Sequence, residues 1–372
     1  MKVLHFIESL GRGGAEQLLV TLLPELQRQN VSAVVVVRAG NMDLVSELQS
    51  RGIFVHCLKQ RHRWNLVGSA RELSGIVRNE SADIIHGHLY FPAVTIALMK
   101  ILRFCRAPSC VTFHNLAYAG ANRAGIKLTG RRLLARVLYR AGIDSFFGVS
   151  DAVARHYEKK LGLATVKVIP NPVDFSVIKE SGAADMATTA DLVLAGRIVP
   201  EKGHSDLLEA LWKLASEGSH PSLVIAGEGP LRGAIEALAE DLGLRQQITF
   251  TGALAHMDLL RALGSAKVAI IPSRFEGFGL VALEAMALGR STIVSDAGGL
   301  PEVVGDTAVV VPVGDTSSMA GAISALLADP ERQAEMGKRA AMRAMNFDLP
   351  YVAEKQIMAY RELLGDHLRQ GD

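Results

Sequence analysis

The chain has 372 residues, of which 49% are hydrophobic and 21% charged, so it has the composition of a folded globular protein but is too long for one compact core. Its three cysteines include no C-x-x-C pair, which argues against a disulfide framework and a zinc site. The most apolar run, 91–102, is shorter than the roughly 20 residues of a membrane-spanning helix. Because no signal-peptide segment is evident either, we expect a cytoplasmic protein.

The net charge of +2 hides a strong asymmetry between the two halves of the chain. Residues 1–170 contain 23 basic and 11 acidic side chains, whereas the remainder contains 17 basic and 27 acidic ones. A basic half suits an anionic surface or an anionic acceptor. The alternative is that the two halves attract each other across a cleft.

Short apolar runs alternate with amphipathic segments throughout the first half. Helical periodicity is found at 15–29 and 66–78. Strands are predicted at 3–7, 33–37, 54–57, 83–86, 109–113, 145–149 and 166–169. This alternation predicts a parallel sheet with helices on both faces.

The same alternation begins again in the second half of the chain. Strands are predicted there at 192–195, 223–226, 248–250, 268–271, 292–295 and 308–311. Pro170 and Pro172 interrupt regular structure between the halves. We therefore predict an N-terminal domain at 1–172, a linker at 173–190, a second domain at 191–350 and a terminal helical segment at 351–372.

The predicted fold class is α/β, with two doubly wound, Rossmann-like parallel sheets that face each other across a cleft. In such sheets, ligands bind where the carboxyl ends of the strands meet the N-termini of the helices. Candidate ligand-binding residues should therefore lie in loops that directly follow strands.

Two glycine-containing loops satisfy this condition. Gly13 and Gly14 follow the first strand and precede the first helix, where backbone N–H groups are free to bind an anion. Arg197 and Lys202 lie in one loop after the first strand of the second half. A guanidinium and an ammonium in one loop suit a diphosphate, although both cations could also be solvated surface residues.

Two glutamates follow the strand predicted at 268–271. Glu276 lies in the loop, and Glu284 lies inside the apolar helix that is expected to start near Gly279. A carboxylate within such a helix needs a partner when it is buried. Either the hydroxyl groups of a ribose or a structural salt bridge would provide that partner.

Taken together, these motifs resemble the retaining glycosyltransferases of family 4, which have the GT-B fold. The resemblance extends from residue 11 to about residue 302. It rests on the Glu276-x7-Glu284 spacing, Gly13-Gly14-Ala15-Glu16, Gly196-Arg197, Lys202-Gly203 and Pro170-Asn171-Pro172-Val173-Asp174. It implies a transferase that moves a hexosyl unit from a nucleotide-diphosphate sugar, UDP- rather than GDP-linked, to a glycan or lipid-linked acceptor, as in polysaccharide or glycolipid biosynthesis.

The resemblance also implies roles for individual residues. Arg197 and Lys202 would hold the donor diphosphate and stabilise the charge of the leaving group. Glu284 would bind the ribose, and Glu276 would contact the transferred hexose. His114, after the strand at 109–113, matches the active-site histidine of the family.

Backbone groups complete the donor site that the resemblance implies. Amides of the segment Gly277, Phe278, Gly279 and Leu280 would contact the sugar or the phosphate. Gly13 and Gly14 would let the first domain close over the donor phosphates. The segment 252–255 would lie near the base, and the C-terminal helix would cross back to the first domain.

We expect no metal and no cofactor. The sequence contains no D-x-D, the motif that holds a metal in many glycosyltransferases of the other common fold. Two protein cations could replace such a metal in stabilising the leaving group. Two other functions stay open, a nucleotide-sugar 2-epimerase on the same fold and a catalytically silent nucleotide-sugar-binding subunit.

The segment 122–140 combines six basic residues with apolar ones. Most helices of this kind bury their apolar side in their own domain. The alternative is that the segment lies on an anionic membrane, as a peripheral protein at the inner face of the cell membrane would require. Nucleic acid is not expected as a partner, because no recognised binding module accompanies the charge.

Overall fold

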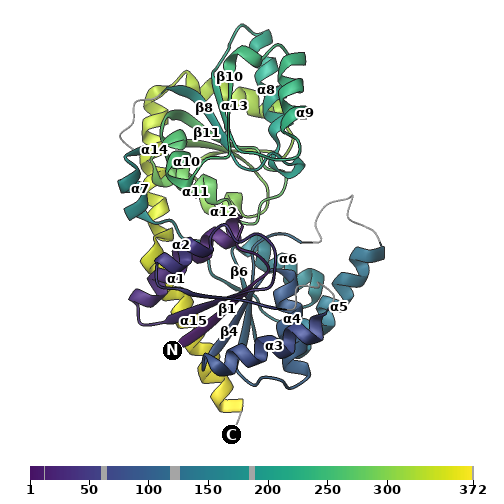
Figure 1. Cartoon of the computed structure of the whole chain (residues 1–372). Helices are drawn as coiled ribbons and strands as arrows, with labels where there is room; N and C mark the ends of the chain where they lie inside the picture. Colours follow the sequence, from purple (N-terminus) through teal and green to yellow (C-terminus); the bar gives the residue numbers. More distant parts are fainter. Residues whose placement is uncertain (12, 60–64, 118–125, 184–188, 371–372) are drawn as a thin grey trace. The chain divides into compact units, whose positions relative to one another are not determined.

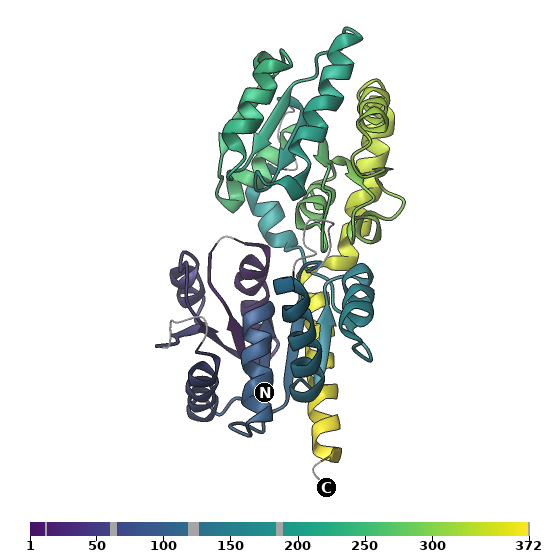
Figure 2. The same ribbon diagram turned by 90° about the vertical axis from the view of Figure 1, so that its right-hand side faces the viewer.

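The computed structural model describes residues 1–11, 13–59, 65–117, 126–183 and 189–370. The chain divides into two compact units, one formed by Met1–Pro172 with Leu349–Asp372 and the other by Val173–Asp348. Each unit contains one parallel sheet with helices packed on it (Figure 1). Figure 2, turned by 90°, shows that helices lie on both faces of each sheet. The predicted α/β fold class is therefore confirmed.

The sheet of unit 1 has seven strands in the order β3-β2-β1-β4-β5-β6-β7. The strands are β1 (Lys2–Ile7), β2 (Ser32–Val37), β3 (Phe54–Cys57), β4 (Ile84–His88), β5 (Ser109–Phe113), β6 (Ser145–Gly148) and β7 (Lys167–Val168). The β-branched run of β2 is buried over five consecutive residues, as expected for a strand covered on both faces. The helices that precede the crossover to unit 2 are α1 (Gly14–Arg28), α2 (Val45–Ser50), α3 (Leu66–Asn79), α4 (Tyr90–Ile101), α5 (Ile126–Gly142) and α6 (Asp151–Leu161).

The sheet of unit 2 has six strands in the order β10-β9-β8-β11-β12-β13. The strands are β8 (Ala190–Ala195), β9 (Leu223–Ala226), β10 (Ile248–Gly252), β11 (Ala266–Ile271), β12 (Ser291–Ser295) and β13 (Val309–Val311). The helices are α7 (Phe175–Ser181), α8 (His204–Ser216), α9 (Arg232–Asp241), α10 (His256–Gly264), α11 (Leu280–Ala287), α12 (Leu300–Val304), α13 (Thr316–Leu327) and α14 (Pro330–Ala344). Because β8 and β11 are neighbours, the loops that follow them meet at one edge of the sheet.

Part of the stretch 173–190, which we expected to be a linker, is a helix. The side chain of Asp174 accepts hydrogen bonds from the backbone N–H groups of Ser176 and Val177 and caps α7. Gly182 ends the helix in the left-handed conformation. The helix packs against α10 and α11 of unit 2. The prolines therefore mark the end of unit 1, while the residues directly after them belong to the second fold.

The C-terminal helix α15 (Leu349–Gln370) packs into unit 1, although the segment directly before it belongs to unit 2. It contacts α1, and its buried residues Val352, Ile357 and Tyr360 belong to the hydrophobic core of unit 1. The Tyr360 hydroxyl lies 2.6 Å from Nδ1 of His86 on β4. Unit 1 is therefore assembled from both ends of the chain.

Among the helices in the described part of the chain, none combines the length and apolar character that a transmembrane segment requires.

We predict that Tyr360→Phe lowers the free energy of unfolding by about 1–3 kcal/mol, because it leaves a fully buried nitrogen of His86 without its hydrogen bond. Urea denaturation followed by circular dichroism measures the change. Tyr351→Phe is the matched control on the same helix, since the Tyr351 side chain is exposed and should tolerate the change. Equal effects of both substitutions would contradict the proposed importance of the buried hydrogen bond.

Candidate functional site

The loop after β8 presents two cations at the carboxyl edge of the unit 2 sheet. Arg197 is exposed and has no side-chain hydrogen bond or ion pair within the described residues. Lys202 ends the short 3-10 helix Pro200–Lys202 and is followed by Gly203, which adopts φ +68° and precedes α8. A Cβ atom at Gly203 would lie 1.9 Å from the Pro272 carbonyl oxygen. Glycine thus allows the Lys202 loop to approach the end of β11.

This close approach brings together two of the predicted site residues. Nζ of Lys202 lies 2.6 Å from Oε2 of Glu276, and the Ser273 hydroxyl donates to the same oxygen at 3.2 Å. The side chains of Lys202 and Glu276 are 25% and 16% exposed. A partly screened ion pair of this kind leaves both groups accessible to a ligand.

Glu284 is also paired in the structure, and sequence reasoning missed its partner. Nε2 of His256 lies 2.7 Å from Oε1 of Glu284. His256 is the first residue of α10, the helix that follows β10, and Glu284 is on α11. The loop segment at 252–255 had been expected near the nucleotide base, but nothing in its sequence marked the next residue as a carboxylate partner.

The segment between the two glutamates contributes backbone rather than side chains. Gly279 has φ +106° and directly precedes α11. Because it has no side chain, it does not cover the first backbone N–H groups of that helix. A Cβ at Gly279 would lie 2.5 Å from a methyl group of Leu300. Phe278 is buried and packs edge-to-face on Phe347, with ring centroids 5.8 Å apart. Any ligand contact of Phe278 therefore involves its main chain.

The remaining predicted residues belong to unit 1. Gly13 is the N-cap of α1, and Gly14 is its first residue. A Cβ at Gly13 would lie 2.3 Å from a carboxylate oxygen of Glu16, so a side chain there would displace that carboxylate. These glycines lie at the carboxyl end of β1, as the sequence predicted for a ligand-binding loop.

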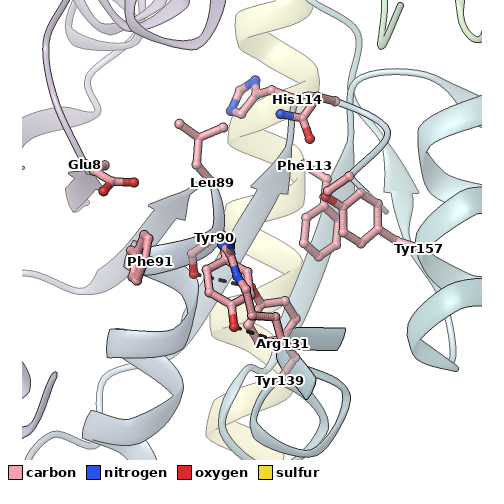
Figure 3. A pocket seen from close by; sticks show the side chains of 11 residues that line it. Glu8, Leu89, Tyr90, Phe91, Phe113, His114, Arg131, Tyr139 and Tyr157 are labelled. Atoms are coloured by element: carbon pink, nitrogen blue, oxygen red, sulfur yellow. Dashed lines mark hydrogen bonds between the residues drawn. The ribbon is translucent and has the colours of Figure 1, made fainter. Parts of the chain in front are cut away.

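His114 lies at the carboxyl end of β5 and lines a pocket of about 260 Å³ in unit 1. Figure 3 shows this pocket, which is lined by both aromatic and charged side chains. Its described lining includes Glu8, Tyr90, Phe91, Arg131, Tyr139 and Tyr157. The Arg131 guanidinium lies over the Tyr90 ring, 4.2 Å from its centroid. Burial lowers the pKa of His114 to about 4, so its imidazole is neutral at pH 7.

A group of buried histidines lies behind His114. Nδ1 of His88 is 3.1 Å from Nε2 of His114, and Nε2 of His88 is 3.1 Å from Nδ1 of His5. His86 and His88, which flank Gly87 on β4, differ in their contacts, because His86 instead bonds Tyr360 and Thr112. By sequence, His86 and His88 end a predicted strand and are weaker candidates than His114 for the active-site histidine, and no motif marks His5.

Two parallel sheets, each covered by helices on both faces, define the GT-B fold. Sucrose-phosphate synthase from Thermosynechococcus elongatus has this fold with a TM-score of 0.82 at 20% identity, covering 98% of this chain and 100% of that one. HepE from Anabaena, solved in complex with UDP, has a TM-score of 0.81 at 20% identity over 97% of this chain and 100% of its own. At this level of identity the similarity concerns the fold.

Sequence similarity shows the family. Residues 12–177 match the model for Glycosyltransferase Family 4, and residues 184–343 match that for Glycosyl transferases group 1. Glycogen synthase from Mycobacterium tuberculosis is 30% identical over 297 residues, which cover 77% of this chain and 70% of that protein. Alpha-D-kanosaminyltransferase from Streptomyces kanamyceticus is 34% identical over 175 residues, 46% of this chain and 45% of that protein. The chain belongs to glycosyltransferase family 4, as its motifs indicated.

We predict that Gly203→Ala destabilises unit 2 more than Gly218→Ala does. Both glycines have positive φ, so alanine should cost about 1–2 kcal/mol at either position. Only at Gly203 does the added Cβ meet backbone, whereas nothing lies within 4 Å at Gly218. Urea denaturation should therefore show at least twice the loss for Gly203→Ala. Equal losses would mean that the loop relaxes without strain.

A second prediction concerns His204, which directly follows Gly203. Burial, and secondarily the charge of Lys202, lowers its pKa from 6.5 to about 4. The unfolded chain therefore binds a proton that the folded chain excludes, and the free energy of unfolding should fall as the pH falls from 6.5 towards 4. His204→Leu should reduce this loss in urea titrations at pH 7 and pH 5. The matched substitution at exposed His220 should leave the loss unchanged.

Proposed function

We propose that this glycosyltransferase moves a hexosyl unit from a nucleotide-diphosphate sugar to a glycan or lipid-linked acceptor with retention of configuration. The observation that carries the proposal is the Lys202–Glu276 pair at the carboxyl edge of β8 and β11, with Arg197 in the same loop. This arrangement offers two cations to a diphosphate and one carboxylate to a sugar hydroxyl.

The chemistry of donor cleavage suits these residues. When the sugar leaves, negative charge develops on the diphosphate, and preorganised cations stabilise that charge strongly. Arg197 is free to turn towards a phosphate, and Lys202 is held in the half-buried loop by Glu276. The proposed mechanism assigns the role of a metal ion to these two side chains, so transfer should be metal-independent.

We assign the two glutamates to hydroxyl groups of the donor. Glu284 would accept hydrogen bonds from the ribose, with His256 fixing the orientation of its carboxylate at 2.7 Å. Glu276 would contact the hexose, and same-face attack by the acceptor would retain the configuration. The acceptor is assigned to unit 1, where His114 lines the aromatic pocket. Aromatic rings stack readily on the apolar faces of sugars.

Relatives with named donors differ in the nucleotide. HepE was also solved with UDP-glucose, whereas a mannosyltransferase of Mycolicibacterium smegmatis, 33% identical over 208 residues, is named GDP-mannose-dependent. We propose a UDP-sugar. The test incubates the purified chain with UDP- and GDP-hexoses and candidate acceptors, with and without EDTA. An α-linked product from an α-linked donor, unaffected by EDTA, is the expected result.

The same assay separates the alternative functions. An isomerised donor without acceptor glycosylation would identify a 2-epimerase. Nucleotide-sugar binding without turnover would identify a silent binding subunit. A product of inverted configuration would overturn retention, and loss of activity in EDTA would overturn metal independence.

We predict that Lys202→Met lowers kcat/KM for the donor about 10²-fold, because it removes a preorganised cation from the leaving group. Lys267→Met is the matched control. Lys267 also forms a lysine–carboxylate pair, at 2.7 Å with Asp191, but that pair lies at the amino end of β8 and β11. Equal activities of both variants in steady-state assays would exclude Lys202 from donor cleavage.

We further propose that unit 1 binds an anionic membrane through α5. Our sequence-based expectation that such a helix most often buries its apolar side does not hold for three residues, since Leu133, Leu134 and Val137 are 62%, 47% and 58% exposed. Arg136 and Arg140 are exposed on the same helix. Exposed apolar side chains beside basic ones suit insertion into an anionic lipid surface.

Liposome flotation tests this surface. The wild-type chain should float with vesicles that contain phosphatidylserine at low salt and less so at high salt. The double substitution Leu133→Glu and Val137→Glu should abolish flotation. Met342→Glu, an exposed methionine of unit 2, is the control that should leave it unchanged. No flotation of the wild type at low salt would remove the membrane proposal.

A further inference from the structure

Three histidines from adjacent strands form a continuous hydrogen-bonded chain in unit 1. His5 lies on β1, His88 ends β4, and His114 follows β5. Parallel pairing places β1 beside β4 and β4 beside β5, so the three rings meet near one edge of the sheet. His5 and His88 are 0% and 2% exposed, and both nitrogen–nitrogen distances in the chain are 3.1 Å.

We propose that His5 and His88 are positioning residues that fix the ring tautomer of His114, with its proton on Nδ1. The proposal rests on the proposed function, in which His114 contacts the substrate. It adds two residues, and a direction of proton sharing, that neither the motifs nor the relatives assign.

The direction of the hydrogen bonds between the three histidines follows from His5, which lies at the buried end of the series. Nε2 of His5 is buried and has no hydrogen-bond partner. A buried N–H without an acceptor is rarer and more costly than an unpaired acceptor. The proton of His5 therefore resides on Nδ1 and is donated to Nε2 of His88. His88 then carries its proton on Nδ1 and donates it to Nε2 of His114.

The three histidines keep this order of donors and acceptors only if all three rings are neutral. Burial lowers the pKa of His5 to about 3 and of His114 to about 4, and it holds the pKa of His88 well below the usual value. A proton added to one ring would also repel the others. Each ring therefore has one N–H and one bare nitrogen at pH 7, so each contact has one donor.

His86 lies close to these three histidines but is not part of their hydrogen-bonded series. Its ring is 4.3 Å from that of His88 between centroids, yet its two nitrogens contact Tyr360 and Thr112. One nitrogen each of His5, His86 and His88 lies within 4.8 Å of the others, the spacing that a three-histidine metal site would need. Since both nitrogens of His86 already have oxygen partners, the hydrogen-bonded arrangement accounts better for these contacts.

The tautomer decides what His114 can do in the pocket. Nδ1 of His114 has no hydrogen-bond partner among the described residues, and the side chain lines the pocket. In the proposed tautomer, Nδ1–H donates a hydrogen bond to a substrate oxygen. The opposite order would leave a bare nitrogen that accepts a proton as a general base.

Nitrogen NMR of the full-length chain tests the proposal directly. In ¹⁵N-histidine-labelled protein at pH 7, long-range ¹H–¹⁵N correlations distinguish a protonated ring nitrogen from a bare one. We expect His114 to be neutral and protonated at Nδ1. Protonation at Nε2, a charged ring, or stoichiometric zinc on these histidines would overturn the proposal.

Variants of His88 test whether this residue fixes the tautomer of His114 and whether that tautomer affects kcat. His88→Asn keeps an N–H donor near the position of Nδ1 and should retain the His114 tautomer, whereas His88→Leu should lose it. Thr112→Val is the control, since it removes a hydrogen bond from neighbouring His86 only. We expect His88→Leu to lower kcat about tenfold or more with little change in donor KM, and His88→Asn to recover much of the loss. An unchanged tautomer and kcat in folded His88→Leu would contradict the proposal.

The two readouts separate this inference from the proposed function. If the wild type shows the expected tautomer but transfers no sugar, the proposed function fails and the proton order stands. If it transfers sugar but carries the opposite tautomer, the proposed function stands and the proposed proton order fails. If His88→Leu does not fold, the wild-type spectrum still decides the proton order.

Discussion

The candidate donor site depends on the contact between the loop after β8 and the loop after β11. Neighbouring parallel strands end at the same sheet edge, and Gly203 lets the first loop reach the Pro272 carbonyl without a side chain between them. This places Lys202 and Glu276 2.6 Å apart although 74 residues separate them. A larger residue at position 203 would separate the two charges that we assign to binding of the donor.

The glutamates of the motif are both paired within the protein, Glu276 with Lys202 and Glu284 with His256. Taking a carboxylate partly out of water is costly unless a partner compensates for the lost hydration. Each pairing therefore holds a carboxylate in position at a half-buried site. A ligand that binds there exchanges one set of hydrogen bonds for another, so it need not desolvate a free charge.

The polar group behind the His114 pocket of unit 1 differs from the donor site, because its histidines are neutral and deeply buried. Direct nitrogen–nitrogen contacts join His5, His88 and His114, and Tyr360 of the C-terminal helix bonds the neighbouring His86. The last helix of the chain thus contributes both to the hydrophobic core of unit 1 and to the polar group behind the His114 pocket. Removing α15 would expose that core and also leave one nitrogen of the buried His86 ring without its hydrogen bond.

The sequence by itself determined the alternation of strands and helices, because β-branched runs and amphipathic periodicity are local properties. It also determined the strand-end loops, since Gly13, Lys202, His114 and Glu276 lie in the segments that follow apolar runs. The helix at 175–181 was not predicted, because the neighbouring prolines indicated a linker although Asp174 is a helix cap. Only the tertiary structure decided that His256 meets Glu284 and that His5 lies behind His88, because strand order and side-chain contacts between distant segments arise from packing rather than from local sequence.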